Sequence, residues 1–333
     1  MNVRLGVGSV AVLLLSFSYS HGQQMSQGAD KPESSMRTVV SSGDEFKKET
    51  LRRIAVEETA VRQLELTHAD DVRLGRSYAQ LGLWCEDAAE WDRSETAMER
   101  AVSLFRRAKE PNGELAVAIA QLGSLHVTMG KLREGEKEEQ EALRLREALN
   151  DRLQMARSWI DLTALYLAEN QFDRAKDYAQ KAVAELVVNG KAVPFDRISA
   201  RYALALALCS LRECPSAIPL LKDAVEEANA KLEAGDFPIG LGNFFLGYAY
   251  WKSGDMADAG PHMQQGTADM SAQLGWGHPY YLAALKQYAQ YLREDKNMEA
   301  LNAVELRIRQ AQQVVDVHSI QSGKAAFGFV GLR

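Results

Sequence analysis

Apolar residues recur at helical spacing along most of the chain. From Asp44 to about Asp316, these stretches are separated by short turns that contain Gly, Pro or Asn. Alternating β-branched residues are scarce, whereas Ala, Leu, Glu, Gln and Arg, which favour helices, are abundant. The pattern therefore predicts an all-α protein made of consecutive helices.

A short motif repeats at a nearly constant interval along this region. It consists of an apolar residue, a small residue and, three positions after that, another apolar or aromatic residue. The intervals between its first members are 41, 40, 42, 42 and 42 residues. Such a period predicts an array of stacked helix pairs, because one pair alone cannot bury its apolar stripe. The anchors are Leu81, Leu122, Leu162, Leu204, Leu246 and Tyr288.

Glycine follows the anchor in three of these units, at Gly82, Gly123 and Gly247. A glycine inside a helix costs about 1 kcal/mol relative to alanine. We therefore expect a neighbouring helix to approach the backbone closely at these positions. The second helix of most units also carries small residues where two helices would cross.

Two units resemble the tetratricopeptide repeat (TPR) family particularly well. Their matching residues are Trp159, Leu162, Tyr166, Asn170, Phe172, Ala175 and Ala182 in the third unit, and Leu246, Gly247, Tyr250, Gly254 and Ala259 in the fifth. The resemblance implies a right-handed superhelical solenoid of antiparallel helix pairs. The period of about 42 residues, against 34 in the common repeat, is similar to the long repeats of kinesin light chains. The segment "LGWGHPYYLAALKQYAQYL" resembles those repeats most.

The sequence divides into four segments. Residues 1–22 have one Arg, an apolar run and small residues, which is typical of a secretory signal peptide, although a retained membrane anchor is the alternative. Residues 23–43 are predicted to be a disordered linker, and residues 44–316 the repeat domain, with an N-terminal half-unit and about six helix pairs. Residues 317–333 form a C-terminal tail. We expect an exported protein, periplasmic or secreted, without a stable membrane anchor after cleavage.

Charge and cysteine content narrow the range of functions. The net charge is −6 and the basic residues are spread out, so nucleic acid is not an expected partner. Three cysteines are too few for a disulfide framework. Cys209 and Cys214 either form a local disulfide or remain two reduced, buried side chains, and the sequence leaves both open.

Recognisable catalytic motifs are absent from the sequence. It contains no Gly-x-Ser-x-Gly elbow, no phosphate-binding loop and no His-Glu-x-x-His motif. We therefore predict no enzyme activity, no cofactor and no metal. His126 takes a position that is Tyr in other units and is expected to pack in the core. The acidic pairs Glu86-Asp87 and Glu138-Glu139 are expected on solvated helix faces.

A candidate binding surface follows from the first helices of successive units, which line the concave face in the TPR family. We place its stripe one position away from the anchors. The predicted partner-binding residues are Tyr202, Phe244, Tyr248, Trp251, Lys286, Gln290 and Arg293. An aromatic floor flanked by cations would suit a peptide with an apolar anchor and acidic flanks. The alternative is that the aromatic residues pack between adjacent helices.

Together these features predict an exported, non-enzymatic scaffold that binds a peptide or protein segment on its concave face. Two other functions remain open at this point. One is glycan binding or processing in the cell envelope, which would need carboxylates near exposed aromatic rings. The other is self-association through the aromatic stripe.

Overall fold

The structure, a computed structural model, describes residues 43–108, 113–188, 192–232 and 237–321. All regular secondary structure in these ranges is helical. The predicted signal peptide, most of the linker and most of the C-terminal tail lie outside the described residues. The helices are α2 (Gly43–Leu66), α3 (Asp71–Asp87), α4 (Trp91–Arg107), α5 (Gly113–Thr128), α6 (Leu132–Ala148), α7 (Arg152–Ala168), α8 (Phe172–Val188), α9 (Pro194–Ser210), α10 (Cys214–Lys231), α11 (Phe237–Lys252), α12 (Met256–Leu274), α13 (Pro279–Glu294) and α14 (Met298–Gln321).

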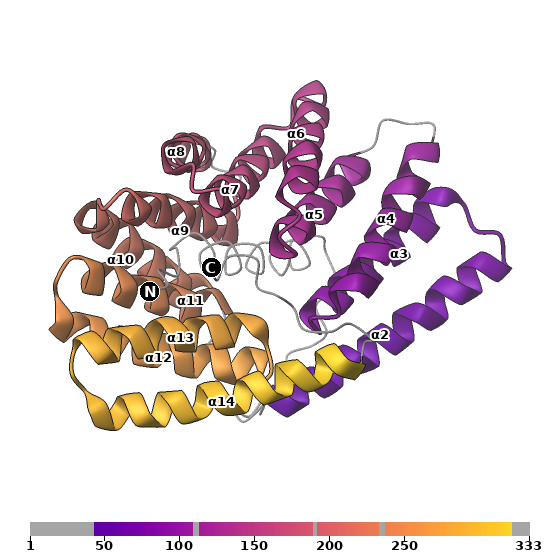
Figure 1. The fold of residues 1–333 in the computed structure, drawn as a ribbon. Coiled ribbons are helices and arrows are strands. Elements are labelled where there is room, and N and C mark those ends of the chain that lie inside the picture. Colours follow the sequence, from indigo (N-terminus) through magenta and orange to yellow (C-terminus); the bar gives the residue numbers. More distant parts are fainter. Residues whose placement is uncertain (1–42, 109–112, 189–191, 233–236, 322–333) are drawn as a thin grey trace.

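After α2 the helices form six pairs, from α3 and α4 to α13 and α14, and each pair packs on the next. Figure 1 shows the pairs following one another around a curve, with α5 and α7 on its inner side and α6 and α8 outside them. The predicted all-α solenoid of helix pairs is confirmed. In the described part of the chain, no helix is both long and apolar enough to cross a membrane.

The turn inside every pair has the same backbone conformation. One residue of each turn has a left-handed φ, and it always lies eight positions after the anchor. Glycine takes this conformation freely, whereas another residue there costs about 1–2 kcal/mol. The repeat therefore extends to the turn geometry, which the anchors alone did not reveal. These residues are Ala89, Gly130, Asn170, Arg212, Gly254 and Lys296.

Close helix approach explains the glycines that follow the anchors. A Cβ placed on Gly247 would lie 2.6 Å from the backbone nitrogen of Met263 and 2.8 Å from the carbonyl oxygen of Ala259, both on α12. Gly82 meets the flexible end of Met98 on α4 instead. In each case the glycine faces the second helix of its own pair. The small-residue pattern therefore fixes which side of each first helix is covered.

The curved array closes on itself. Helix α12 packs against α2, and the first pair reaches the last one through aromatic rings. The Trp91 ring at the start of α4 lies 6.1 Å from the ring of Tyr280 and 6.4 Å from that of His278, measured between centroids. Residues from opposite ends of the solenoid are thus buried in one contact, which neither the period nor the motif predicts.

Candidate partner-binding surface

The four aromatic residues of the predicted binding stripe are buried. The exposed fractions are 0% for Tyr202, 1% for Phe244, 6% for Tyr248 and 4% for Trp251. The expectation of an exposed aromatic floor is therefore wrong, and the alternative of packing between adjacent helices describes these side chains.

The stripe is buried because it faces the first helix of the following unit. The Tyr202 hydroxyl on α9 donates a hydrogen bond to the carbonyl oxygen of Pro238 on α11, at 2.9 Å. The Trp251 indole on α11 donates to the Glu294 carboxylate on α13, at 2.7 Å, and its ring lies edge-on to Tyr291. Both residues join successive units rather than facing a partner.

Charged residues repeat this arrangement elsewhere in the array. Arg76 on α3 pairs with Glu114 on α5. Arg157 on α7 binds both oxygens of Asp196 on α9, at 3.1 and 3.0 Å. In each contact the earlier first helix donates and the later one supplies a carboxylate.

The polar members of the predicted site lie where the array ends. Lys286 and Arg293 on α13 line an open groove of about 340 Å³ between α13 and α14. Gln290 does not line it, and its amide lies 3.5 Å from Glu294 on the same helix. The structure therefore brings two of the seven predicted residues into a groove. Its complete lining is Lys286, Ala289, Arg293, Glu305, Ile308 and Arg309.

Another row of residues lies on the first helices, directly before the anchors. The residue after each anchor faces the second helix of its own pair, and successive residues of an α-helix are 100° apart. The residue before each anchor therefore lies about 200° away, on the side opposite the second helix. The glycines could have identified this row from the sequence. Its members are Gln80, Gln121, Asp161, Ala203, Phe245 and Gln287.

A buried ionic cluster joins the second and third pairs. Arg146 on α6 is 1% exposed, donates to the Ser158 hydroxyl at 2.6 Å and lies 4.0 Å from an oxygen of Asp161. Burial raises the pKa of Asp161 to about 7, although Arg146 and Arg157 oppose the shift. Burial and the charge of Asp161 also raise the pKa of Glu139. Glu139 is fully buried, so its predicted place on a solvated face is wrong.

A second acidic cluster lies at the closing contact. Glu86 and Asp87 end α3, and both are buried instead of solvated as the sequence suggested. Burial raises the pKa of Glu86 to about 8, and burial with the neighbouring Glu86 charge raises that of Asp87. Burial raises the pKa of the Tyr280 hydroxyl, and the charges of the same two carboxyl groups add to this rise. Because burial penalises ionised carboxylates, the closed array favours their protonated forms.

His126 is buried, as its position in the repeat predicts. Its ring nitrogens lie 2.6 Å from Glu138 and 2.9 Å from Glu95. Burial lowers the pKa of His126, but the hydrogen bonds and charges of the two carboxylates outweigh it and raise the pKa overall. Glu138 on α6 therefore joins the two helices of the second pair, whereas Glu95 on α4 joins the first pair to the second.

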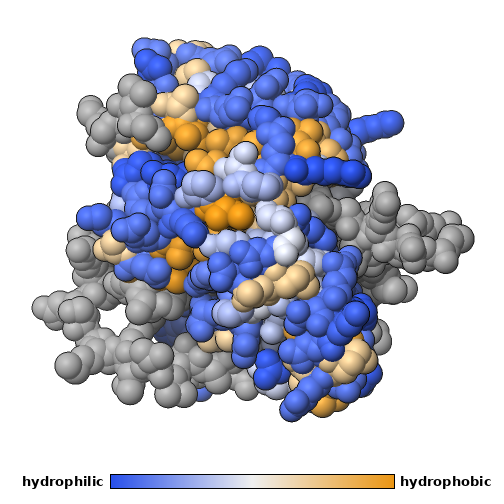
Figure 2. All heavy atoms as spheres, turned by 90° about the vertical axis from the view of Figure 1, so that its left-hand side faces the viewer, coloured by the Kyte–Doolittle hydropathy of each residue, from blue (hydrophilic) through white to orange (hydrophobic). Residues whose placement is uncertain are grey.

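A further groove of about 510 Å³ lies on the outer side, between α10 and α12. Figure 2 faces this side and shows apolar patches between bands of hydrophilic surface. Lys222 and Glu226 give the groove opposite charges, and His262 stacks on Tyr250 at 5.7 Å. Burial lowers the pKa of His262, so the ring is neutral near pH 7. The groove has no dominant charge that would select a ligand.

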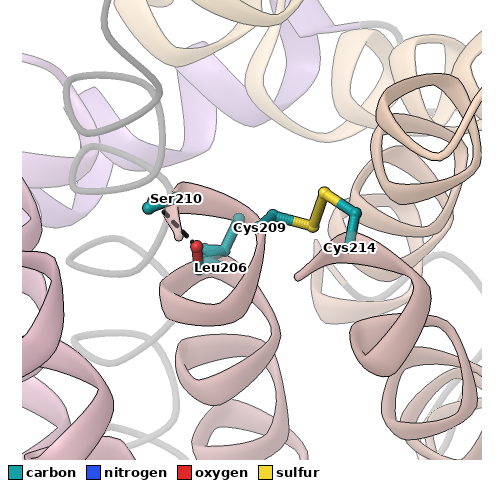
Figure 3. Close-up of a disulfide and its surroundings, with 4 residues drawn as sticks. All are labelled: Leu206, Cys209, Ser210 and Cys214. Carbon is teal, nitrogen blue, oxygen red and sulfur yellow. Dashed lines mark hydrogen bonds between the residues drawn. A yellow bond between two sulfur atoms is a disulfide. The ribbon is translucent and has the colours of Figure 1, made fainter. Parts of the chain in front are cut away.

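Cys209 and Cys214 form a disulfide across the turn between α9 and α10, with their Cα atoms 4.2 Å apart (Figure 3). Beside it, the Ser210 hydroxyl donates to the carbonyl oxygen of Leu206 at 2.8 Å. Cys85 is a free, buried thiol whose pKa is raised to about 12, mainly by burial. In the ranges that the structure describes, no group of three His, Cys, Asp or Glu side chains could hold a metal ion.

Comparison with known proteins gives the fold and not a family. No family model and no curated protein matches the chain. Among solved structures, the Rap conjugation gene regulator of the plasmid pLS20, in complex with the Phr* peptide, has a TM-score of 0.65 at 15% identity, over 97% of this chain and 99% of its own. The apo form of RapI has a TM-score of 0.60 at 12% identity, over 83% of this chain and 94% of its own. Aspartyl phosphate phosphatase F from Bacillus subtilis has a TM-score of 0.52 at 14% identity, over 99% of this chain and 98% of its own. The helix pairs, the repeat and these similarities together identify a TPR-type solenoid.

Proposed function

We propose that the protein is an exported, non-enzymatic scaffold that binds a peptide or protein segment along the inner face of its helical array. The observation that carries the proposal is the curved stack of helix pairs, in which α5 and α7 lie on the inner side of the curve and α6 and α8 outside them. Gln80 and Ser210 are partly exposed polar residues on the first helices. Such side chains suit hydrogen bonds to the backbone of an extended peptide. The likeness to a regulator solved with a peptide supports this use of the fold.

Photo-crosslinking in intact cells tests the inner face. We expect p-benzoylphenylalanine at Gln80 or Ser210, which are partly exposed on first helices, to give adducts with one and the same protein. Ser210 lies seven residues after Ala203 and therefore on the same face. The matched controls are Lys137 and Asp223, which are exposed on second helices. Mass spectrometry identifies the adducts. Adducts that form equally from the control positions would contradict an inner binding face.

Export rests on the N-terminal pattern and on the disulfide. Disulfides persist in oxidising compartments and are rare in the cytosol, so the Cys209–Cys214 bond supports secretion. In cells that express the full chain, we expect the protein outside the cytoplasm, cleaved after Ser20 or Gly22. N-terminal sequencing of the fractionated protein measures this. An uncleaved chain in the cytosol with two reduced thiols would refute export.

Glycan processing is less well supported than peptide binding. It would need carboxylates beside open aromatic rings. Glu86 and Asp87 lie near Tyr280, but all three are buried in the closing contact. The phosphatase among the similar structures shares the fold at 14% identity, which does not extend its activity to this chain.

A further inference from the structure

The last pair, α13 and α14, has no further helix pair packed on it within the described residues. The first helices α5, α7, α9, α11 and α13 each pack against the second helix of the pair before them. Within the described residues, no helix follows α14 to cover the last pair in the same way. The groove of about 340 Å³ between α13 and α14 lies between the two helices of this pair.

Register positions connect this groove with the buried contacts inside the array. Lys286 lies 42 residues after Phe244 and 84 after Tyr202, and Arg293 lies 42 after Trp251. Tyr202 and Trp251 face the next first helix. Positions that are aromatic and covered inside the array are therefore cationic and partly or fully exposed at its end.

Contacts within the array show what a covering helix supplies. Where a first helix donates to the next, the acceptor is a carboxylate at Glu114, Asp196 and Glu294 and a backbone carbonyl at Pro238. Second helices show the same arrangement, in which the earlier unit supplies the cation and the later unit the acid. Arg106 on α4 pairs with Glu141 on α6, and Lys176 on α8 pairs with Glu213 at the start of α10. Near the N-terminus the acid lies on the earlier unit and the cation on the later one. Arg93 pairs with Glu58 there, and both Lys131 and His126 pair with Glu95.

The groove carries the same donor character, although Lys286 already lies 3.5 Å from the Gln312 side-chain oxygen on α14, and no further unit follows in the described part of the chain. Lys286, Arg293 and Arg309 outnumber the single acid Glu305, which Arg293 binds at 2.7 Å. Ala289 and Ile308 supply its apolar part. The residues after α14, 322–333, contain Lys324 and Arg333 and no Asp or Glu. Their charge is therefore the same as that of the groove, which disfavours them as its occupant.

We propose that the groove between α13 and α14 is a docking site for an acidic amphipathic helix of another protein, which takes the place of the first helix of a further pair. Its carboxylates pair with Lys286, Arg293 and Arg309. An apolar side chain between them packs on Ala289 and Ile308. Helix-in-groove recognition of this kind uses anchors one helical turn apart. The site differs from the inner face and does not depend on it.

A synthetic peptide tests the docking site on the full chain. The probe is a 16-residue helical peptide with Leu and Glu on one face, and its control has Gln at every Glu position. We expect the Glu peptide to bind, with an affinity that falls as salt rises, because charge pairs at a surface are screened. The Gln peptide is expected to bind at least tenfold more weakly. Fluorescence anisotropy measures both.

Charge reversal of the groove gives the decisive comparison. The variant K286E/R293E/R309E is expected to lose at least tenfold in affinity for the Glu peptide. The matched control R62E/R133E/R144E reverses three cations that are exposed elsewhere and should bind as the wild type does. If the groove variant fails to fold, as judged by circular dichroism, the milder K286Q/R309Q replaces it with the same expected direction.

Three results would overturn the docking site. One is equal binding of the Glu and Gln peptides, and another is equal binding by the groove and control variants. The third is stronger binding after deletion of residues 322–333, because the chain itself would then occupy the groove. If the crosslinks at Gln80 and Ser210 do not form, the proposed function is refuted, but the peptide-binding results for the groove are not affected. The two proposals can therefore fail separately.

Discussion

Replacing Arg146 with Ala is expected to lower the free energy of unfolding by about 3–5 kcal/mol, which is the usual effect of removing one partner of a buried ion pair. Arg146 is the cation next to the buried Asp161 carboxyl group, and it also favours ionisation of Glu139. Its loss leaves two acidic groups in the interior and a cavity where the side chain was. Urea unfolding followed by circular dichroism measures the change.

Arg144 provides a control on the same helix. It is exposed on α6, so Arg144→Ala should change the free energy of unfolding by less than about 0.5 kcal/mol. Combining Arg146→Met with Glu139→Gln and Asp161→Asn removes all three charges and should recover much of the loss, since a well-packed neutral cluster can replace a buried ionic one. Equal stability of Arg146→Ala and Arg144→Ala would contradict the role of Arg146.

The free energy of unfolding is expected to rise as the pH falls from 8 to 5. The folded pKa of Glu86 is about 8 and that of Asp161 about 7, both above the values of 4.5 and 3.8 for the free groups. The folded chain therefore holds protons that the unfolded chain releases. For each group, the free energy of unfolding falls as the pH rises from the pKa of the unfolded chain to the pKa of the folded chain. Each proton held in this way changes stability by about 1.4 kcal/mol per pH unit.

Other buried groups act in the same direction over this range. The pKa values of Asp87 and Glu139 are raised by burial, and the net shift of His126 is also upward. For His126, the stabilisation is complete below pH 6.5 and is lost as pH rises through its folded pKa. Carboxylates with lowered pKa values, such as Glu95 and Glu227, reverse the trend only at more acidic pH.

Urea unfolding at pH 5, 6, 7 and 8 checks this dependence. The variants Glu86→Gln and Asp161→Asn should each flatten the slope, because their side chains no longer titrate. Asp223→Asn, at an exposed position on α10, serves as the control and should keep the wild-type slope. Stability that is highest at pH 8, or a slope that neither buried variant changes, would refute the assignment.

The sequence predicts the repeat well because the repeat is local. The apolar anchors, the glycines after them and the small residues on the second helices all respond to packing within one unit and its neighbour. For this reason the helix pairs and the burial of His126 were predictable from spacing. Helix α14 continues beyond Asp316 to Gln321, past the predicted end of the pattern.

The faces of the first helices were harder to predict. The sequence pattern places the stripe with Phe244, Tyr248 and Trp251 on the concave surface, but in the structure this stripe is buried and Trp251 faces the next unit. A difference of one residue in register turns a helix by 100°, so a correct repeat can still give the wrong face. The burial of Glu86 and Asp87 was not predictable from spacing, because the residue near them, Tyr280, lies at the other end of the array.

The contact between the first and last units changes how the solenoid loses its structure. In an open repeat array each unit touches only its neighbours, so the terminal units separate first and the stability is a sum of local contributions. Here the packing of α12 on α2 and of Trp91 on Tyr280 gives both ends a shared interface. Fraying at one end removes contacts from the other end as well. Closure therefore couples the terminal units and makes unfolding of the array more cooperative than its repeat sequence implies.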